Sequence, residues 1–299
     1  MIFSLFYPRK YLIFLPFCDI FPHHSNNCEV IIMKFIDQQP VPLWSGTAPL
    51  ALGNDPEDNP TLTVFYPRQW RSTRKAVVVL PGGGYACLCQ HEGYEYAKWL
   101  ADNGYTGIVC NYRVHTAEHP YHHPVMISDA ARAIRVVRAH AEELGIDPHK
   151  IGIMGSSAGG HLAASCATHH EIGLREEGES TEKDLGRPDF TILCYGVLTF
   201  GEYTHVGTRT NLLGATPDPA LVDFCSMEKS ADSHTPRAFI WHTWEDQAVP
   251  VQNSLLYAAR LKEMGVHCDV HIYERGVHGI GLAGGHPWTT ELLRWLEQV

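Results

Sequence analysis

The sequence lacks any sustained run of lysine or arginine, and this lack restricts the partners that the chain can bind. Its 299 residues include 33 acidic and 23 basic side chains, which give a formal net charge of -10. Nucleic acids and anionic membrane surfaces are bound mainly through clustered positive charge. We therefore expect no nucleic-acid partner and no membrane partner, and a ligand that is neutral or weakly charged.

Motifs that bind nucleotides or metal ions are also missing. The glycine run 82–84 is not part of a Gly-Lys-Ser/Thr or Gly-x-Gly-x-x-Gly motif, so it is not a nucleotide loop. Cys87 and Cys89 have the wrong spacing for a zinc knuckle or a thioredoxin-type pair. Four histidines crowd one loop around Glu118: His115, His119, His122 and His123. Their spacings match no ligand pattern on one helix or hairpin, so we expect no metal and no cofactor, and we expect the histidines to line or flank a pocket.

The apolar run near the N-terminus, residues 11–17, is too short to span a bilayer. It follows a basic pair and resembles a weak signal sequence, but Pro16 interrupts it and no small-x-small cleavage site is evident. We favour the interpretation that residues 1–34 are an upstream extension of the reading frame, with Met33 as the natural start. This interpretation predicts a cytoplasmic protein, whereas a signal sequence would direct it to the periplasm or out of the cell.

The composition is that of a globular protein with a sizeable core. Hydrophobic residues make up 44% and charged residues 19% of the chain, which argues against a disordered or fibrous protein. The nine cysteines are an odd number, and Cys110, Cys166 and Cys194 lie inside apolar runs. We expect these three to be reduced and to act as small buried hydrophobic side chains.

Strands and helices are expected to alternate along residues 35–299. The unbroken apolar run 76–80 is typical of a strand that is buried on both faces of a parallel sheet. We expect strands at 61–66, 75–80, 107–112, 150–154, 190–195, 238–243 and 267–273, and helices at 93–103, 125–144, 157–168, 251–264 and 288–297. Single helices between strands require right-handed crossovers, so we predict one domain with a mostly parallel, doubly wound sheet.

Three stretches interrupt this alternation. Residues 38–60 are rich in Pro, Gly, Asn and Asp and are expected to form loops and turns. Residues 171–189 are strongly charged and are expected to form a solvated loop. Residues 196–236 are long enough to form a small cap over the carboxyl ends of the strands.

The pattern Gly-x-Ser-x-Gly at 155–159 lies between the expected strand 150–154 and a run of small residues. It matches a nucleophile elbow, in which a sharp turn from strand to helix exposes the serine hydroxyl, here that of Ser157. Short stretches of Gly, Ser and Ala also occur as plain turns or helix N-caps. The pentapeptide alone leaves both readings open.

The residues after two later strands favour catalysis. Ligands of open α/β sheets bind beyond the carboxyl ends of the strands. Asp246 follows the strand at 238–243 and His278 follows the strand at 267–273. The order Ser, acid, His is that of the α/β-hydrolases. His278 would take a proton from Ser157 and pass it to the leaving group, and Asp246 would orient the imidazole, with Glu245 as the rival acid.

Backbone amides and aromatic side chains could complete this site. The amides of Gly83 and Gly84, after a buried strand, and that of Ala158, after the nucleophile, are predicted to bind the oxyanion. Three aromatic side chains near the strand ends could stack on a sugar ring or an acyl group: Tyr85, Tyr112 and Trp244. Packing in the core is an equally open role for each of them.

Taken together, these residues resemble those of the acetyl xylan esterase-like α/β-hydrolases, which are related to the hormone-sensitive-lipase-like esterases. The similarity extends from Leu43 to the C-terminus and rests on several motifs: Leu43-Trp44, Gly46-Thr47-Ala48-Pro49, the 81–85 loop, Asn111-Tyr112-Arg113-Val114, residues 155–163, Trp241-His242-Thr243 with Asp246 and Val249-Pro250, and Glu274-Arg275-Gly276 with His278-Gly279. It implies cofactor-free removal of acyl groups, acetyl or feruloyl, from carbohydrate such as xylan. The resemblance carries over Ser157, Asp246 and His278 as the catalytic triad.

The same resemblance implies that Gly83, Gly84 and Ala158 are the oxyanion donors, but this chain differs from the family at one position of the loop. The lipase-like relatives have histidine before the three glycines, where this chain has Pro81. This difference leaves open whether Gly83 or Gly84 is the main donor. Other enzymes of the same fold remain as alternatives, namely a small-ester carboxylesterase and a serine peptidase. A non-catalytic binding module would be expected to have a broken triad, whereas all three members are present here. The sequence does not indicate an oligomeric state.

Overall fold

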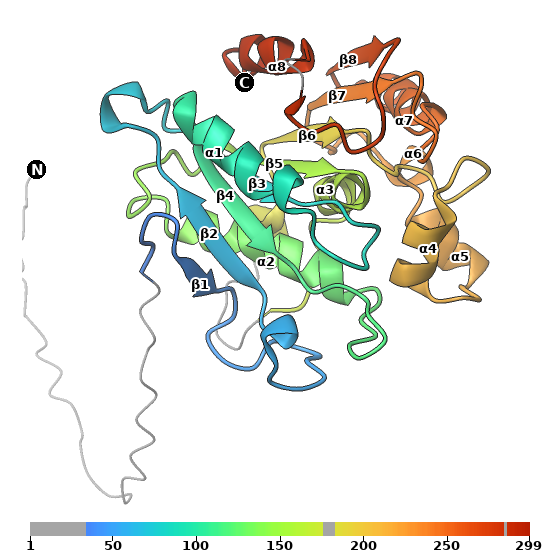
Figure 1. Ribbon diagram of the computed structural model, residues 1–299, viewed down its shortest axis with the longest axis horizontal. Coiled ribbons are helices and arrows are strands. Elements are labelled where there is room, and N and C mark those ends of the chain that lie inside the picture. Colours follow the sequence, from blue (N-terminus) through green and yellow to red (C-terminus); the bar gives the residue numbers. More distant parts are fainter. Residues whose placement is uncertain (1–33, 176–182, 284–285) are drawn as a thin grey trace, which may run out of the picture. The chain divides into compact units, whose positions relative to one another are not determined.

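An eight-stranded sheet organises the computed structural model, which describes residues 34–175, 183–283 and 286–299 (Figure 1). Its strands are β1 (Pro40–Pro42), β2 (Thr61–Phe65), β3 (Ala76–Leu80), β4 (Thr106–Asn111), β5 (Ile151–Ser156), β6 (Phe190–Cys194), β7 (Ala238–Thr243) and β8 (Cys268–Tyr273). They lie in the order β1-β2-β4-β3-β5-β6-β7-β8. The predicted N-terminal extension, residues 1–34, lies outside the described residues except for Lys34.

Strands β3 to β8 pair in parallel, and β1 and β2 join the edge beside β4 in antiparallel fashion. The predicted mostly parallel sheet is therefore confirmed. β1 was not expected, because residues 38–60 were predicted to form only loops and turns. Pro40 and Pro42 flank Val41 in this strand, and the strand lies at the sheet edge, where a residue without an N–H group is tolerated.

Helices cover both faces of the sheet (Figure 1). The crossover helices are α1 (Tyr94–Asp102), α2 (Val125–Ala139), α3 (Ala158–Thr168) and α7 (Gln252–Glu263), and α8 (Trp288–Leu296) follows the last strand. α1 and α8 pack with Val77 and Val79 on one face, whereas α2, α3 and α7 pack with Val78 and Leu80 on the other. β3 thus contributes to two core layers, which is why its apolar run is unbroken.

The remaining elements lie in the connections between strands. Residues 196–236 contain the short helices α4 (Val206–Leu213), α5 (Pro219–Phe224) and α6 (Met227–Ser230). The 3₁₀ turns are η1 (Pro56–Asp58), η2 (Gln69–Arg71), η3 (Gln90–Glu92) and η4 (Lys183–Gly186). α2 ends at Ala139, before the predicted 144, and the His140 Nδ1–H caps its last turn by donating to the Val136 carbonyl at 2.9 Å. No helix among the described residues has the length and apolar character needed to cross a membrane.

The two outer glycines of the 155–159 pattern allow α3 to lie directly on the sheet. A Cβ atom on Gly155 would lie 2.0 Å from the Gly159 carbonyl oxygen. A Cβ atom on Gly159 would lie 2.1 Å from the Leu80 carbonyl oxygen in β3. Both contacts are with backbone, which cannot move aside as a flexible side chain can. The glycines therefore set the distance between the start of α3 and the ends of β3 and β5.

We expect Gly155→Ala to destabilise the protein by about 1–3 kcal/mol, in the range of overpacked cores, because the added methyl group meets backbone atoms. The measurement is urea unfolding, compared with Gly46→Ala as a matched control. Nothing lies within 4 Å of a Cβ atom at Gly46, so that substitution should be nearly neutral. Equal stability of the two variants would contradict this account of the close approach.

Candidate active site

Ser157 lies on a strained turn between β5 and α3. Its φ of 52° and ψ of -118° are rarely adopted by a residue other than glycine. Three backbone hydrogen bonds hold this conformation: the Ser157 amide donates to the Cys194 carbonyl at 3.0 Å, and its carbonyl accepts from the amides of His161 and Val197 at 3.1 Å each. Strain of this kind persists only where the surroundings fix the backbone, and it is common at functional sites.

The structure brings Ser157, His278 and Asp246 together although they are far apart in sequence. His278 Nε2 lies 2.9 Å from Ser157 Oγ, and His278 Nδ1 lies 2.7 Å from Asp246 Oδ2. Asp246 follows β7 and His278 follows β8, so all three side chains come from the carboxyl edge of the sheet. The geometry allows the serine hydroxyl to donate to the imidazole while the imidazole donates to the carboxylate.

Asp246 is buried and is surrounded by hydrogen-bond donors. Its Oδ1 accepts from the amides of Ala248 and Val249 at 2.9 Å each. Burial raises the pKa of Asp246, but hydrogen bonds from His242 and His278 outweigh this effect, so the pKa lies well below its ordinary value. Glu245, the rival acid, is exposed, and its carboxylate accepts from the Gly276 amide at 3.4 Å. Asp246 is therefore the carboxylate in contact with His278.

His242 is a second histidine on the same carboxylate, and the sequence reasoning gave it no role. It is fully buried in β7, where its Nε2–H donates to Asp246 Oδ2 at 3.2 Å and to the Val249 carbonyl at 3.0 Å. Its Nδ1 accepts from the Ser254 hydroxyl at 2.8 Å. A histidine in an otherwise apolar strand, four residues before a candidate acid, was the available signal.

The loop after β3 presents backbone amides beside the serine. The Gly82 amide donates to Glu92 Oε2 at 3.0 Å, so it is already engaged. No hydrogen-bond acceptor for the amides of Gly83, Gly84 or Ala158 is found in the described part of the chain. Gly83 and Gly84 have φ values of 126° and 64°, which favour glycine. These amides are therefore available to a bound oxygen, and their role as an oxyanion hole stays a prediction.

Two side chains that are distant in sequence also form hydrogen bonds with this loop. The Tyr112 hydroxyl donates to the Pro81 carbonyl at 2.6 Å. The Asn211 side-chain amide, in α4, donates to the Gly84 carbonyl at 2.8 Å. The loop is thus held at both ends, by Tyr112 just after β4 and by Asn211 of α4.

Comparison with known proteins identifies the family. The BD-FAE family model matches residues 62–261, about two thirds of the chain. The chain belongs to the BD-FAE family. The resemblance to acetyl xylan esterase-like proteins is confirmed, and so is the predicted α/β-hydrolase fold with its mostly parallel sheet.

Named relatives of this BD-FAE chain include two proteins and one solved structure. It is 37% identical over 210 residues to endo-1,4-beta-xylanase B of Butyrivibrio fibrisolvens, covering 70% of this chain and 33% of that protein. It is 33% identical over 235 residues to an acetylxylan esterase of Xylanibacter ruminicola, covering 75% and 46%. The acetyl ester-xyloside bifunctional hydrolase of Caldicellulosiruptor lactoaceticus has 39% identity and a TM-score of 0.80, covering 88% of this chain and 97% of that one. The chain thus spans a third to about half of the first two relatives.

Two of the three aromatic side chains predicted to bind substrate in this BD-FAE protein are buried instead. Tyr85 and Tyr112 are at most 2% exposed, so neither can offer a ring face to a ligand, and that prediction is wrong for both. The Tyr85 hydroxyl donates to His161 Nδ1 at 2.7 Å, and burial lowers the pKa of His161 to about 4, which keeps the ring neutral. Both tyrosines therefore help to hold the loop after β3 in place. Trp244, by contrast, is 64% exposed.

The crowded histidines of the BD-FAE chain lie in three different environments. His123 lines a small cavity behind Tyr85, together with His161 and His169. His115 and His122 stack loosely on each other, with ring centroids 4.5 Å apart. His119 contacts Asp55 and Asp58 instead. That the four histidines line or flank the substrate pocket stays a prediction.

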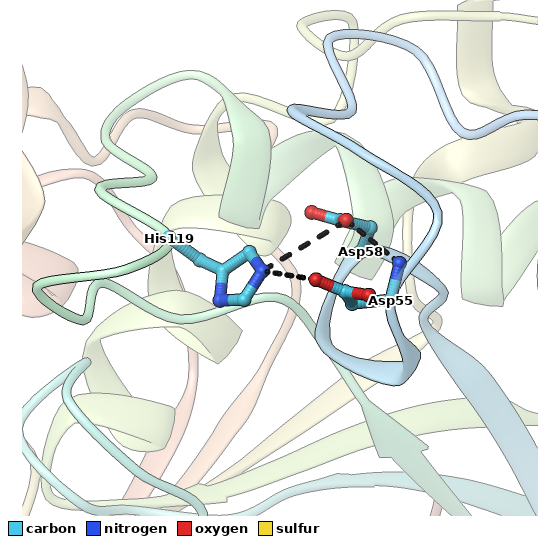
Figure 2. Close-up of side chains that lie close together, drawn as sticks. All are labelled: Asp55, Asp58 and His119. Carbon is cyan, nitrogen blue, oxygen red and sulfur yellow. Dashed lines mark hydrogen bonds and ion pairs between the residues drawn. The ribbon is translucent and has the colours of Figure 1, made fainter.

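His119 faces two aspartates of the loop before β2 (Figure 2). Its Nε2 lies 3.4 Å from Asp55 Oδ2 and 3.9 Å from Asp58 Oδ2. By donor type and spacing, these three form the one group in the described ranges that could hold a metal ion. Asp58 is buried, and its oxygens already accept from the Tyr121 hydroxyl and the Asp55 amide. We interpret the group as an ion pair that ties this loop to the loop after β4.

The lowered pKa of Asp246 predicts a contribution to stability that is lost in acid. The unfolded chain binds this proton near the ordinary value of 3.8, so the contribution is complete above that pH and declines as the pH falls towards the lowered pKa. We expect Asp246→Asn to be less stable than the wild type at neutral pH, with a difference that shrinks in acid. Urea unfolding across the acid range measures it.

Asp269→Asn is the matched control for this experiment, because Asp269 is exposed on β8. Its stability should follow that of the wild type at every pH. A loss in Asp246→Asn that stays constant from neutral pH into acid would contradict the proposed ionisation.

Proposed function

We propose that this chain is a serine esterase that removes acyl groups, acetyl groups first of all, from xylan or its fragments. The observation that supports this most directly is the contact of Ser157 Oγ with His278 Nε2 at 2.9 Å, beside amides without acceptors. Relatives named as an acetylxylan esterase and an acetyl ester-xyloside hydrolase support the choice of substrate.

The first half of the reaction forms an acyl-enzyme. Ser157 Oγ attacks the ester carbonyl carbon while its proton moves to His278 Nε2. The carbonyl oxygen becomes negative and is bound by amides of Gly83, Gly84 and Ala158. The tetrahedral intermediate then collapses, the bond to the sugar oxygen breaks, and His278 gives its proton to that oxygen. The deacetylated sugar leaves with its hydroxyl group restored.

The second half repeats these steps with water. His278 takes a proton from a water molecule, the resulting hydroxide attacks the acyl carbon, and the proton returns to Ser157 Oγ as acetate leaves. Asp246 remains ionised throughout and accepts the Nδ1–H of His278, which fixes the tautomer in which Nε2 is free to act as a base. The buried carboxylate also stabilises the imidazolium that forms in each half.

Trp244 is proposed to contact the sugar. It lies two residues before Asp246, and its exposed indole offers a flat apolar face. Sugar rings pack on such faces through their C–H groups. The exposed side chain of Val277, next to His278, adds apolar surface beside the catalytic residues. A neutral carbohydrate ester also suits a chain with no basic cluster.

The proposal includes a reducing location, the cytoplasm. Cys110, Cys166 and Cys194 are buried and unpaired in β4, α3 and β6, where they act as small apolar side chains. Such thiols are typical of proteins that mature in a reducing compartment. The ligand is proposed to be a small ester or an oligosaccharide ester.

The test of this function is a substrate panel with the wild type and Ser157→Ala. We expect the wild type to release acetate from acetylated xylan, and the variant to lose activity by about 10⁶-fold, because no nucleophile remains. Ser165→Ala, a buried serine further along α3, is the matched control and should keep most of the activity. Ferulate release, p-nitrophenyl acetate and peptide anilides complete the panel. Cleavage of peptide anilides alone would identify a peptidase, and retained activity in Ser157→Ala would refute the nucleophile.

The role of Trp244 is tested on two substrates. We expect Trp244→Ala to raise KM for acetylated xylo-oligosaccharides by about 2- to 10-fold, the value of one aromatic contact, and to leave p-nitrophenyl acetate unaffected. Trp70→Ala, which removes another exposed indole, in η2, serves as the control. Equal losses on both substrates would show that Trp244 supports the fold and does not bind sugar.

A further inference from the structure

A buried carboxylate lies beneath the two loops that the proposed reaction needs. Glu92, at the end of η3, is 2% exposed, and each of its oxygens accepts one hydrogen bond. The Gly82 amide donates to Oε2 at 3.0 Å, and the Tyr195 hydroxyl donates to Oε1 at 2.8 Å. The nearby ring nitrogen of His91 lies 4.0 Å from Oε1. Burying a carboxylate is unfavourable unless its partners are fixed, so this network constrains what it touches.

The first partner, Gly82, begins the proposed oxyanion loop. One peptide group joins Pro81 to Gly82, and it is held at both ends: its carbonyl accepts from Tyr112 and its N–H donates to Glu92. A Cβ atom at Gly82 would lie 2.2 Å from Glu92 Oε2, so glycine is needed for the carboxylate to come this close. This accounts for a third glycine in a loop where only two amides face the ligand.

The second partner, Tyr195, leads to the histidine loop. Its hydroxyl accepts from the Gly281 amide at 3.2 Å while it donates to Glu92. Its ring packs edge-on against His278, with centroids 5.1 Å apart. Tyr195 has a φ of 37°, a strained value for a large side chain, at the end of β6. The backbone is therefore constrained where the tyrosine meets the catalytic histidine.

η3 has a second contact with the same loop. The His91 Nε2–H donates to the Gly279 carbonyl at 3.0 Å, directly after His278. Gly279 and Gly281 have φ values of 74° and 59°, so this loop turns through conformations that glycine adopts freely. Without outside contacts such a loop has many accessible conformations. His91 of η3 therefore holds this loop before Ile280, and Tyr195, which is bound to Glu92, holds it after Ile280.

We propose that Glu92 is a positioning residue that couples the oxyanion loop to the loop of His278 through Tyr195. The inference rests on the proposed esterase function. In that reaction the base and the oxyanion donors must act on one tetrahedral intermediate, and a misplacement of about 1 Å costs on the order of 10²-fold in rate. Glu92 sets the distance between the two loops, because its two oxygens bind one partner from each side.

Two conservative variants test the coupling. Glu92→Gln keeps the shape but has a single acceptor oxygen, so it cannot accept from both Gly82 and Tyr195. Tyr195→Phe keeps the ring against His278 and removes the hydroxyl. We expect each to lower kcat for acetyl esters by about 10- to 100-fold, less than the removal of an oxyanion donor, with KM changed less than about 3-fold. If Glu92→Gln does not fold, Tyr195→Phe tests the proposal alone.

The affinity for an aryl boronic acid provides a second measurement. It would not change if Glu92 and Tyr195 only stabilised the fold. The boronate forms a negatively charged tetrahedral adduct with the serine and so reports on the oxyanion donors and His278 together. The boronate affinity should fall in parallel with kcat/KM in both variants. The double variant should lose little more affinity than either single variant, because both substitutions remove the same hydrogen bond between Glu92 and Tyr195.

Tyr257→Phe, another fully buried tyrosine, located in α7, is the matched control and should keep wild-type kcat and boronate affinity. Folded Glu92→Gln or Tyr195→Phe with wild-type kcat and boronate affinity would overturn the proposal. Losses that add fully in the double variant would do so too. Ser157→Ala separates the two ideas: if it stays active the esterase proposal fails, and if it is inactive while both positioning variants are normal, only the coupling fails.

Discussion

The close approach of α3 to the carboxyl ends of β3 and β5 is the constraint on which the site depends. Because Gly155 and Gly159 have no side chains, the helix starts directly on the sheet, and the chain must turn sharply between them. That turn places Ser157 in a strained conformation, with its hydroxyl at the edge where β7 and β8 also end. His278 and Asp246 can then reach it from neighbouring loops. The geometry of the site therefore depends on how closely α3 packs against the sheet.

Backbone strain recurs at this same edge, which holds three of the six non-glycine residues with positive φ in the described part of the chain. Of the non-glycine residues with positive φ, Tyr85, Ser157 and Tyr195 follow β3, β5 and β6. Each is buried and each is held by hydrogen bonds from other elements. Strained backbone needs rigid surroundings, and the doubly wound sheet with its two core layers supplies them. The apolar core and the polar site are therefore parts of one arrangement, because the first fixes the geometry of the second.

Sequence alone could predict the features that depend on local patterns. The parallel strands appear as apolar runs, and Ser157, Asp246 and His278 could be named as candidates because each lies in the segment after an expected strand. β1 could not be predicted, since it pairs through backbone in a proline-rich stretch. Tyr85 and Tyr112 were wrongly predicted to contact the substrate, because the burial of a side chain depends on the residues that pack over it. Glu92 was missed because its partners, Gly82 and Tyr195, are distant in sequence, and no spacing records those contacts. His242 lies only four residues before Asp246, so its spacing was a signal that the sequence analysis did not use.

The hydrogen bond from Asn211 to the Gly84 carbonyl has a kinetic consequence. It fastens α4 to the loop that would hold the oxyanion, so the α4–α6 segment cannot swing away while that loop keeps its shape. Among the described residues, α4 therefore forms a fixed wall beside this loop. In the proposed esterase, turnover would not wait for α4 to move away from the site, and a lipid interface would give no activation through this segment.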